Sequence, residues 1–152
     1  MKRRKAREYA LQFLYRIDFM NTSRGLSNNT DLSWIKDDFG VFWEDISEED
    51  RDIKEFSESI VIGTIKHLKE IDSIIQQVTE KWKFSRIACI DRNILRLATF
   101  ELLFKKDIPA KVAINEAIEI AKVYSTEESS AFINGILDRI AKEFSHKGIN
   151  LS

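Results

Sequence analysis

The sequence has few of the residues that interrupt helices. Its 152 residues include one proline and five glycines, and long alternating apolar and polar runs are missing. The expected class is therefore all-α, a compact single domain over residues 1–152 with about seven helices. No uncharged apolar run reaches the ~18 residues of a membrane-spanning helix, and no secretory signal stands at the start. A cytoplasmic protein fits these absences.

Cysteine and histidine are scarce too, which limits the chemistry. The single Cys89 excludes an intramolecular disulfide and, inside an apolar segment, is interpreted as a core thiol. His67 and His146 are far apart and lack metal-ligand spacing, so neither a metal nor a cofactor is expected. There is no glycine-rich phosphate loop, nucleophile elbow or catalytic Ser/His/Asp order. An enzyme is not expected.

Positive charge is concentrated at the N-terminus. The whole chain has a net charge of −1, but its first seven residues carry five positive charges, so the remainder carries a net −6. Cations at the start of a helix oppose the helix dipole, which indicates a role other than helix stability. A basic patch on an acidic body is the electrostatic pattern of a nucleic-acid-binding surface. The five cations are Lys2, Arg3, Arg4, Lys5 and Arg7.

The first helix is predicted over residues 3–20. Its core stripe is Ala6, Ala10, Phe13, Ile17 and Met20. Leu11 and Tyr15 project from the other side, in line with the cations. A ring that continues a basic stripe can stack on unpaired bases, whereas the plainer interpretation is that Tyr15 and Leu11 pack on a second helix.

The middle of the chain predicts four further segments. Trp34 to Trp43 is rich in aromatic residues and is expected to form a short helix or lid on the core, interrupted by Gly40, with an exposed partner surface as the alternative. Ser47 to Asp50 signals a helix that ends near Leu68, and a second helix runs from about Asp72 to Lys83. Residues 87–104 are apolar nearly all round and should be deeply buried. Residues 21–50 match no motif.

Residues 111–142 are predicted to be the centre of the molecule. Pro109 favours a helix start, and the helix that follows is apolar around most of its circumference. Ser125 and Glu128 have the spacing of a capping box, which starts a last, amphipathic helix. Asp91 and Glu101 fall inside the apolar arc of the preceding helix. Buried carboxylates need partners, so pairing with Arg92, Arg96 or a helix N-terminus is expected; docking of a protein at Asp91 is the alternative.

Three separated blocks of sequence carry a resemblance. Residues 112–122 read VAINEAIEIAK and residues 132–138 read FINGILD; upstream are DRNILRLA at 91–98, followed by FEL at 100–102, and RRKARE at 3–8, followed by ALQ and LY. Together these resemble the NusB family of bacterial transcription antitermination factors. The resemblance implies two small helical bundles packed across each other.

The resemblance also implies a function. Family members bind the boxA element of nascent rRNA transcripts as a single strand, pair with the ribosomal small-subunit protein NusE, and modify RNA polymerase so that it passes terminators. The N-terminal cations would hold phosphates, Gln12 would contact a base edge, and Tyr15 would stack on a base. Asp91 would contact the protein partner. Four further positions match family residues near the RNA path: Glu128, Ser129, Phe132 and Asn134.

Some interpretations of these positions stay open. Phe132 also fits plain core packing, and Glu128 also fits a helix cap. A protein-interaction module that binds itself as a homodimer or binds NusE, with weak RNA affinity alone, is the competing class. Similar domains also form the N-terminal part of certain rRNA cytosine methyltransferases; if the chain is complete, it has room only for the binding module.

Overall fold

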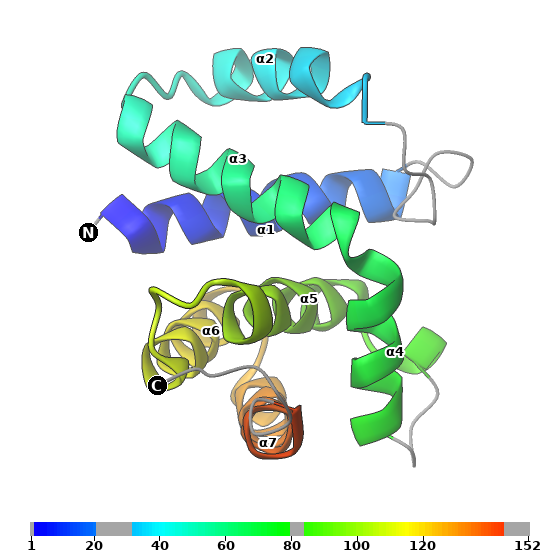
Figure 1. Cartoon of the computed structure of the whole chain (residues 1–152). Helices are drawn as coiled ribbons and strands as arrows, with labels where there is room; N and C mark the ends of the chain where they lie inside the picture. The colour runs from blue at the N-terminus through cyan, green and yellow to red at the C-terminus, as the bar shows by residue number, and fades with distance from the viewer. Residues whose placement is uncertain (1, 21–31, 80–83, 145–152) are drawn as a thin grey trace.

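The computed structural model describes residues 2–20, 32–79 and 84–144, and within these ranges it holds seven α-helices, one short 3-10 helix and no strand (Figure 1). The all-α prediction is confirmed. The 3-10 helix spans Phe84–Arg86. The α-helices are α1 (Lys2–Met20), α2 (Ile35–Ile46), α3 (Arg51–Lys66), α4 (Leu68–Val78), α5 (Cys89–Phe104), α6 (Ala110–Tyr124) and α7 (Glu127–Phe144).

Helices α1 to α3 form the first bundle, in which aromatic rings join α2 to α1. The ring of Phe13 stacks on Phe39 with centroids 4.4 Å apart, and Tyr9 meets the edge of Trp43 at 5.7 Å. The Trp43 indole N–H donates to a Glu58 carboxylate oxygen at 2.7 Å. The predicted lid is thus a helix packed on the core. The predicted interruption at Gly40 is wrong, because α2 continues through it.

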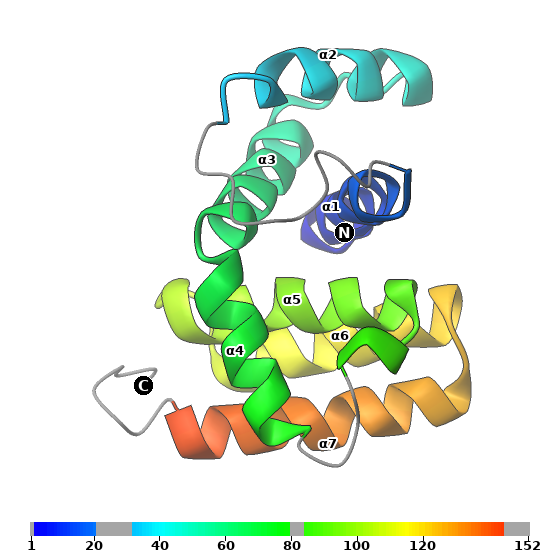
Figure 2. The same cartoon turned by 90° about the vertical axis from the view of Figure 1, so that its right-hand side faces the viewer.

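Helices α4 to α7 form the second bundle, and α5 is the centre of the molecule (Figure 2). Twelve of its sixteen residues are buried, and it packs against α1, α3, α4, α6 and α7. The prediction that residues 111–142 form the centre is wrong. Helix α6 packs mainly between α5 and α7, and its Val112 and Val123 are 43% and 71% exposed.

A close approach of α3 and α5 joins the two bundles. At Gly63 a Cβ atom would overlap the ring of Phe100, so only glycine allows α3 to lie this near α5. The ring of Phe100 thereby fills the space beside the α3 backbone. Figure 1 shows α1 and α3 on one side of α5, with α7 on the other.

Two predicted helix starts are wrong. The capping hydroxyl of α7 belongs to Thr126, which accepts from the Ser129 backbone N–H at 3.0 Å, whereas Ser125 ends α6. Helix α4 begins at Leu68, four residues before the predicted start, because His67 alone separates it from α3. Asp50 caps α3 as the sequence indicated, accepting from the Ile53 N–H at 3.2 Å. Trp82 and Lys83 lie outside the described residues.

Candidate nucleic-acid interface

The first turns of α1 bring the predicted cations to one end of the molecule, where carboxylates from other parts of the chain meet three of them. Arg4 donates from Nε and Nη2 to both oxygens of Glu116 on α6, each at 2.7 Å. Lys2 lies 3.2 Å from an Asp50 oxygen and 3.4 Å from one of Asp52, at the start of α3. These carboxylates offset the unfavourable placement of positive charge at the positive end of a helix.

Arg7 does not belong to the exposed surface, and its prediction as a phosphate contact is wrong. Its side chain is 5% exposed and forms an ion pair with Glu101 of α5 at 2.8 Å. Glu101 therefore has a partner that the sequence did not indicate, since Arg92 and Arg96 had been expected. Burial raises the pKa of Glu101 above its ordinary value, although the hydrogen bonds from Arg7 oppose this.

Arg3 and Lys5 are exposed cations of α1, as Lys2 and Arg16 are, and both lie over aromatic rings. The Arg3 guanidinium lies over the ring of Phe56, 4.6 Å from its centroid, and the Lys5 ammonium lies 5.8 Å from the Tyr9 centroid. Such contacts hold the stem of a long side chain against the surface and keep its charge near water. Both charges are open to a phosphate.

Further along α1, Gln12 and Tyr15 occupy different environments. The Gln12 amide donates to the Tyr124 hydroxyl of α6 at 3.1 Å, and that hydroxyl donates to Glu8 at 3.0 Å. Tyr15 is partly exposed and stacks on Phe19, with centroids 5.5 Å apart and ring planes 8° apart. Leu11, which was expected on the same side as Tyr15, is fully buried.

The second group of predicted residues lies at the start of α7. Ser129 donates from its hydroxyl to an Asp91 oxygen at 2.7 Å, which joins the predicted RNA and partner positions directly. Asp91 is 6% exposed, so it is buried without the arginine partner that was expected. Glu128 and Asn134 are exposed, and Phe132 is partly buried against the core.

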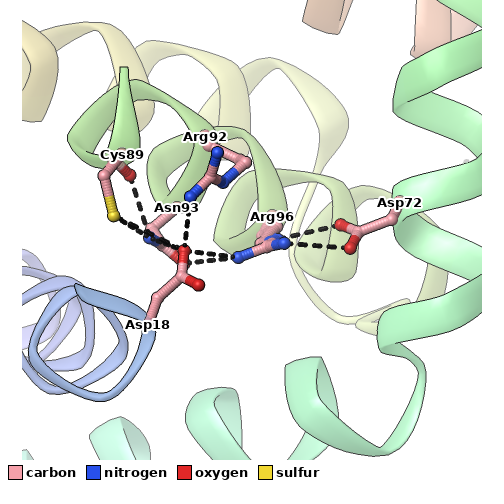
Figure 3. Close-up of polar contacts among 6 residues, drawn as sticks. All are labelled: Asp18, Asp72, Cys89, Arg92, Asn93 and Arg96. Atoms are coloured by element: carbon pink, nitrogen blue, oxygen red, sulfur yellow. Dashed lines mark hydrogen bonds and ion pairs between the residues drawn. The ribbon is translucent and has the colours of Figure 1, made fainter. Parts of the chain in front are cut away.

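A network of charged residues fixes the other end of α1 (Figure 3). One oxygen of Asp18 accepts from Arg92 at 3.0 Å, Asn93 at 3.1 Å and Arg96 at 3.0 Å. Arg96 also donates to both oxygens of Asp72 on α4, at 2.8 and 2.9 Å. The same network holds the segment of α1 that carries Tyr15 and Phe19.

The Asp18 network also includes Cys89, which is only partly buried. Its sulfur lies 3.4 Å from Asp18 Oδ2. Partial burial and the negative charge of Asp18 raise the pKa of the Cys89 thiol, so the neutral thiol is favoured. The prediction of a core thiol is therefore only partly right.

Sequence reasoning missed Glu116 and Phe19. Phe19 is 60% exposed, and its position four residues after Tyr15 was a usable signal, since residues at that spacing share a helix face. Glu116 gave no signal, because its partner Arg4 is 112 residues away. Among the described residues no group of three or more His, Cys, Asp or Glu side chains is arranged to hold a metal ion. None of the helices described here has the length and apolar character needed to cross a membrane.

Comparisons with known proteins agree in one family. The sequence model of the NusB family matches residues 4–142. The transcription antitermination protein NusB of Thermodesulfovibrio yellowstonii is 51% identical over 144 residues, which are 94% of this chain and 93% of that one. The T. maritima NusB structure has a TM-score of 0.76 and 43% identity, covering 93% of this chain and 91% of that one. A crystal structure of antitermination factors NusB and NusE in complex with dsRNA has a TM-score of 0.79 and 27% identity, with 94% and 98% coverage.

Proposed function

The chain belongs to the NusB family, and from this premise we propose that it is a transcription antitermination factor. It binds boxA RNA of nascent rRNA transcripts together with NusE and acts on RNA polymerase. It does so in the cytoplasm as a single RNA-binding domain that catalyses no reaction. The observation that carries this proposal is the surface of α1, which has exposed cations near its start and the stacked rings of Tyr15 and Phe19, partly exposed and exposed, near its end.

The cations differ in what they offer an RNA strand. Arg3 and Lys5 present charge to solvent, whereas Lys2 and Arg4 are already paired with carboxylates. A phosphate gains most from a cation that does not have to leave a carboxylate first. Arg3 and Lys5 therefore supply the largest share of the phosphate contacts, and Arg7 supplies none, because it is buried.

The ring pair favours a single strand. Base pairs in a duplex hide the faces on which an aromatic ring stacks, whereas unpaired bases expose them. Tyr15 is the ring on which a base stacks, and Phe19 packs against the other face of that ring. Gln12 is the candidate for a hydrogen bond to the edge of a base. The further candidate RNA contacts are on α7: Glu128, Ser129, Phe132 and Asn134. Asp91 is the candidate position for the contact with NusE, and because it is buried it would act through the Ser129 hydroxyl that donates to it.

The test is a salt titration of RNA affinity. Each phosphate neutralised in a single strand contributes about 0.7 to the slope of log affinity against log salt. Replacing Arg3 and Lys5 by alanine should flatten the slope by about 1.4. Tyr15→Ala should weaken binding of a single strand by about 1 to 3 kcal/mol, with the slope unchanged.

The matched control is Lys36→Ala with Lys69→Ala, which removes the same charge from exposed positions on α2 and α4. This pair should leave the slope as it is. Equal flattening by both pairs would mean that only net charge matters, and the proposed surface on α1 would be wrong. A Tyr15→Ala chain that binds single and double strands with the parent's affinity would exclude stacking.

A further inference from the structure

Two hollows lie on either side of Lys2 and Arg3, and their charges differ. The α6 groove, about 260 Å³, lies between the first two turns of α1 and the start of α6. The α3 groove, about 470 Å³, lies between the same end of α1 and the first turns of α3. Both adjoin the cations assigned to phosphates, but neither was part of the predicted RNA surface.

The α6 groove combines a basic wall with an apolar one. Four cations of α1 line one side, but Arg7 is buried and paired with Glu101. The other three cations against the carboxylates Asp107 and Glu116 leave an excess of one positive charge. Ile108, Pro109 and Val112 form the apolar part. Pro109 and Val112 are exposed, and Ile108 is buried beneath them. A wall of cations facing an apolar wall matches a nucleotide, which has a charged phosphate on one side and the apolar face of its base on the other.

The α3 groove lacks this combination. Its two cations, Lys2 and Arg3, are balanced by Asp52 and Glu55. Its one aromatic side chain, Phe56, already carries the guanidinium of Arg3 at 4.6 Å from its centroid. A phosphate entering this hollow would meet no net positive charge, and a base would have to displace Arg3. The larger hollow is therefore the poorer site.

Arg4 is suited to hold a phosphate at the edge of the α6 groove. Its Nε and Nη2 donate to Glu116, which fixes the guanidinium plane and leaves Nη1 outside that pair. Glu116 is fixed in turn, since its Oε1 lies 3.6 Å from Nη1 of the buried Arg7. A donor held in place in advance loses little conformational entropy when it binds.

We propose that the α6 groove seats one nucleotide of the bound RNA, with its phosphate against Arg3 and Arg4 and its ribose and base against Pro109 and Val112. The RNA surface thus extends from α1 across the turn that precedes α6. The volume of the groove, at the low end for small-ligand sites, limits it to a single nucleotide. This inference rests on the proposed function and adds residues to it.

The experiment uses two matched pairs of variants in the full chain, with a labelled single-stranded boxA-like RNA of about 12 nucleotides as the probe. Val112→Ser is paired with Val123→Ser, since both valines are exposed on α6 but only Val112 lines the groove. Asp107→Asn is paired with Glu55→Gln, which removes a carboxylate from the α3 groove instead. Affinity is measured at low and at high salt.

Opposite effects are expected from the two groove variants. Val112→Ser removes apolar contact and should weaken binding about fivefold at both salt concentrations. Asp107→Asn removes repulsion of the phosphate and should tighten binding about two- to threefold at low salt, and less at high salt. An unfolded variant would not bind more tightly. Tighter binding by Asp107→Asn therefore cannot be attributed to a loss of folding, as weaker binding by Val112→Ser could be. Val123→Ser and Glu55→Gln should bind like the parent.

Two results would overturn the inference and leave the proposed function intact. One is parental affinity in Val112→Ser while the parent binds the probe. The other is equal tightening by Asp107→Asn and Glu55→Gln. This would mean that RNA affinity responds to the electrostatic field of the whole protein and not to a carboxylate in the α6 groove. A parent chain that does not bind the probe would overturn the proposed function, and this inference with it.

Discussion

Ion pairs join helix α1 to α5 near both ends of α1. At one end α1 supplies the cation and α5 the carboxylate, and at the other end the roles are reversed. Near its start, Arg7 of α1 pairs with the buried Glu101 of α5. Near its end, Asp18 is the carboxylate, and Arg92 and Arg96 of α5 are the cations. The first pair is enclosed, with both side chains at most 5% exposed, whereas Asp18 is 13% exposed and shares one of its donors, Arg96, with Asp72.

The pKa values of the two carboxyl groups differ for the same reason. Burial raises the pKa of Glu101, because a single arginine does not compensate for the loss of water. Burial also acts to raise the pKa of Asp18, but the charge of Arg96 and hydrogen bonds from Arg92 and Asn93 outweigh it and hold the pKa below its ordinary value. Deeper burial with one arginine partner therefore raises the pKa of Glu101, whereas shallower burial with several donors lowers that of Asp18.

The largest expected effect comes from breaking the enclosed pair. Arg7→Ala leaves Glu101 buried and unpaired, so the free energy of unfolding should fall by about 3 to 5 kcal/mol, measured by urea denaturation at pH 7. The loss should shrink at pH 5, because Glu101 then takes up a proton more readily. As a control, Arg7→Met combined with Glu101→Leu should recover most of the stability. A double variant as unstable as Arg7→Ala would assign the loss to packing.

A smaller loss is expected at the other end of α1. Asp18→Ala should cost about 2 kcal/mol, because Arg96 keeps both hydrogen bonds to Asp72 and the remaining donors lie nearer water. Asp45→Ala is the control, since Asp45 and Arg16 form an exposed pair at 3.8 Å and should contribute little. If Asp18→Ala lowers the free energy of unfolding as much as Arg7→Ala does, the proposed difference in stability between the two ends of α1 is wrong.

The smallest effect is on the pH dependence of stability, and its sign differs between the two ends. The lowered pKa of Asp18 gives stability that is present above the unfolded value, about 3.9, and is lost as the pH falls below it. The pKa of Glu101 is raised, so as the pH falls the folded state takes up this proton before the unfolded state does, and the contribution of Glu101 to stability increases. Urea midpoints between pH 7 and 3 should fall less steeply in Asp18→Asn and more steeply in Glu101→Gln. The same slope in both variants would contradict these directions.

Local patterns predicted the fold well where one face of a helix is buried. The stripe Ala6, Ala10, Phe13 and Ile17 is buried as its spacing indicated, and so is most of α5. The central role given to α6 failed because Val112 and Val123 were counted as core, although hydrophobic residues also lie on surfaces. A pattern in one helix does not tell how many neighbours will cover it.

For the candidate site, the sequence showed where the cations are concentrated and not how the fold treats each of them. Five cations close together in the sequence look alike, and only the fold distinguishes buried Arg7 from exposed Arg3. That difference depends on Glu101, which is 94 residues away from Arg7. The groove at α6 was equally hidden, because its two walls come from distant parts of the chain. Tertiary contacts of this kind leave no mark in local spacing.

The pairing of α1 with α6 has a consequence for when the RNA surface comes into being. Arg4 meets Glu116 and Gln12 meets Tyr124, each pair separated by the same 112 positions, so α1 depends on a helix made much later in the chain. During synthesis the ribosome makes α1 first, and the cations emerge long before the carboxylate that orients them. Closing so long a loop is slow relative to local helix formation. A nascent chain that stops before α6 therefore carries the charges of an RNA-binding protein without its recognition surface.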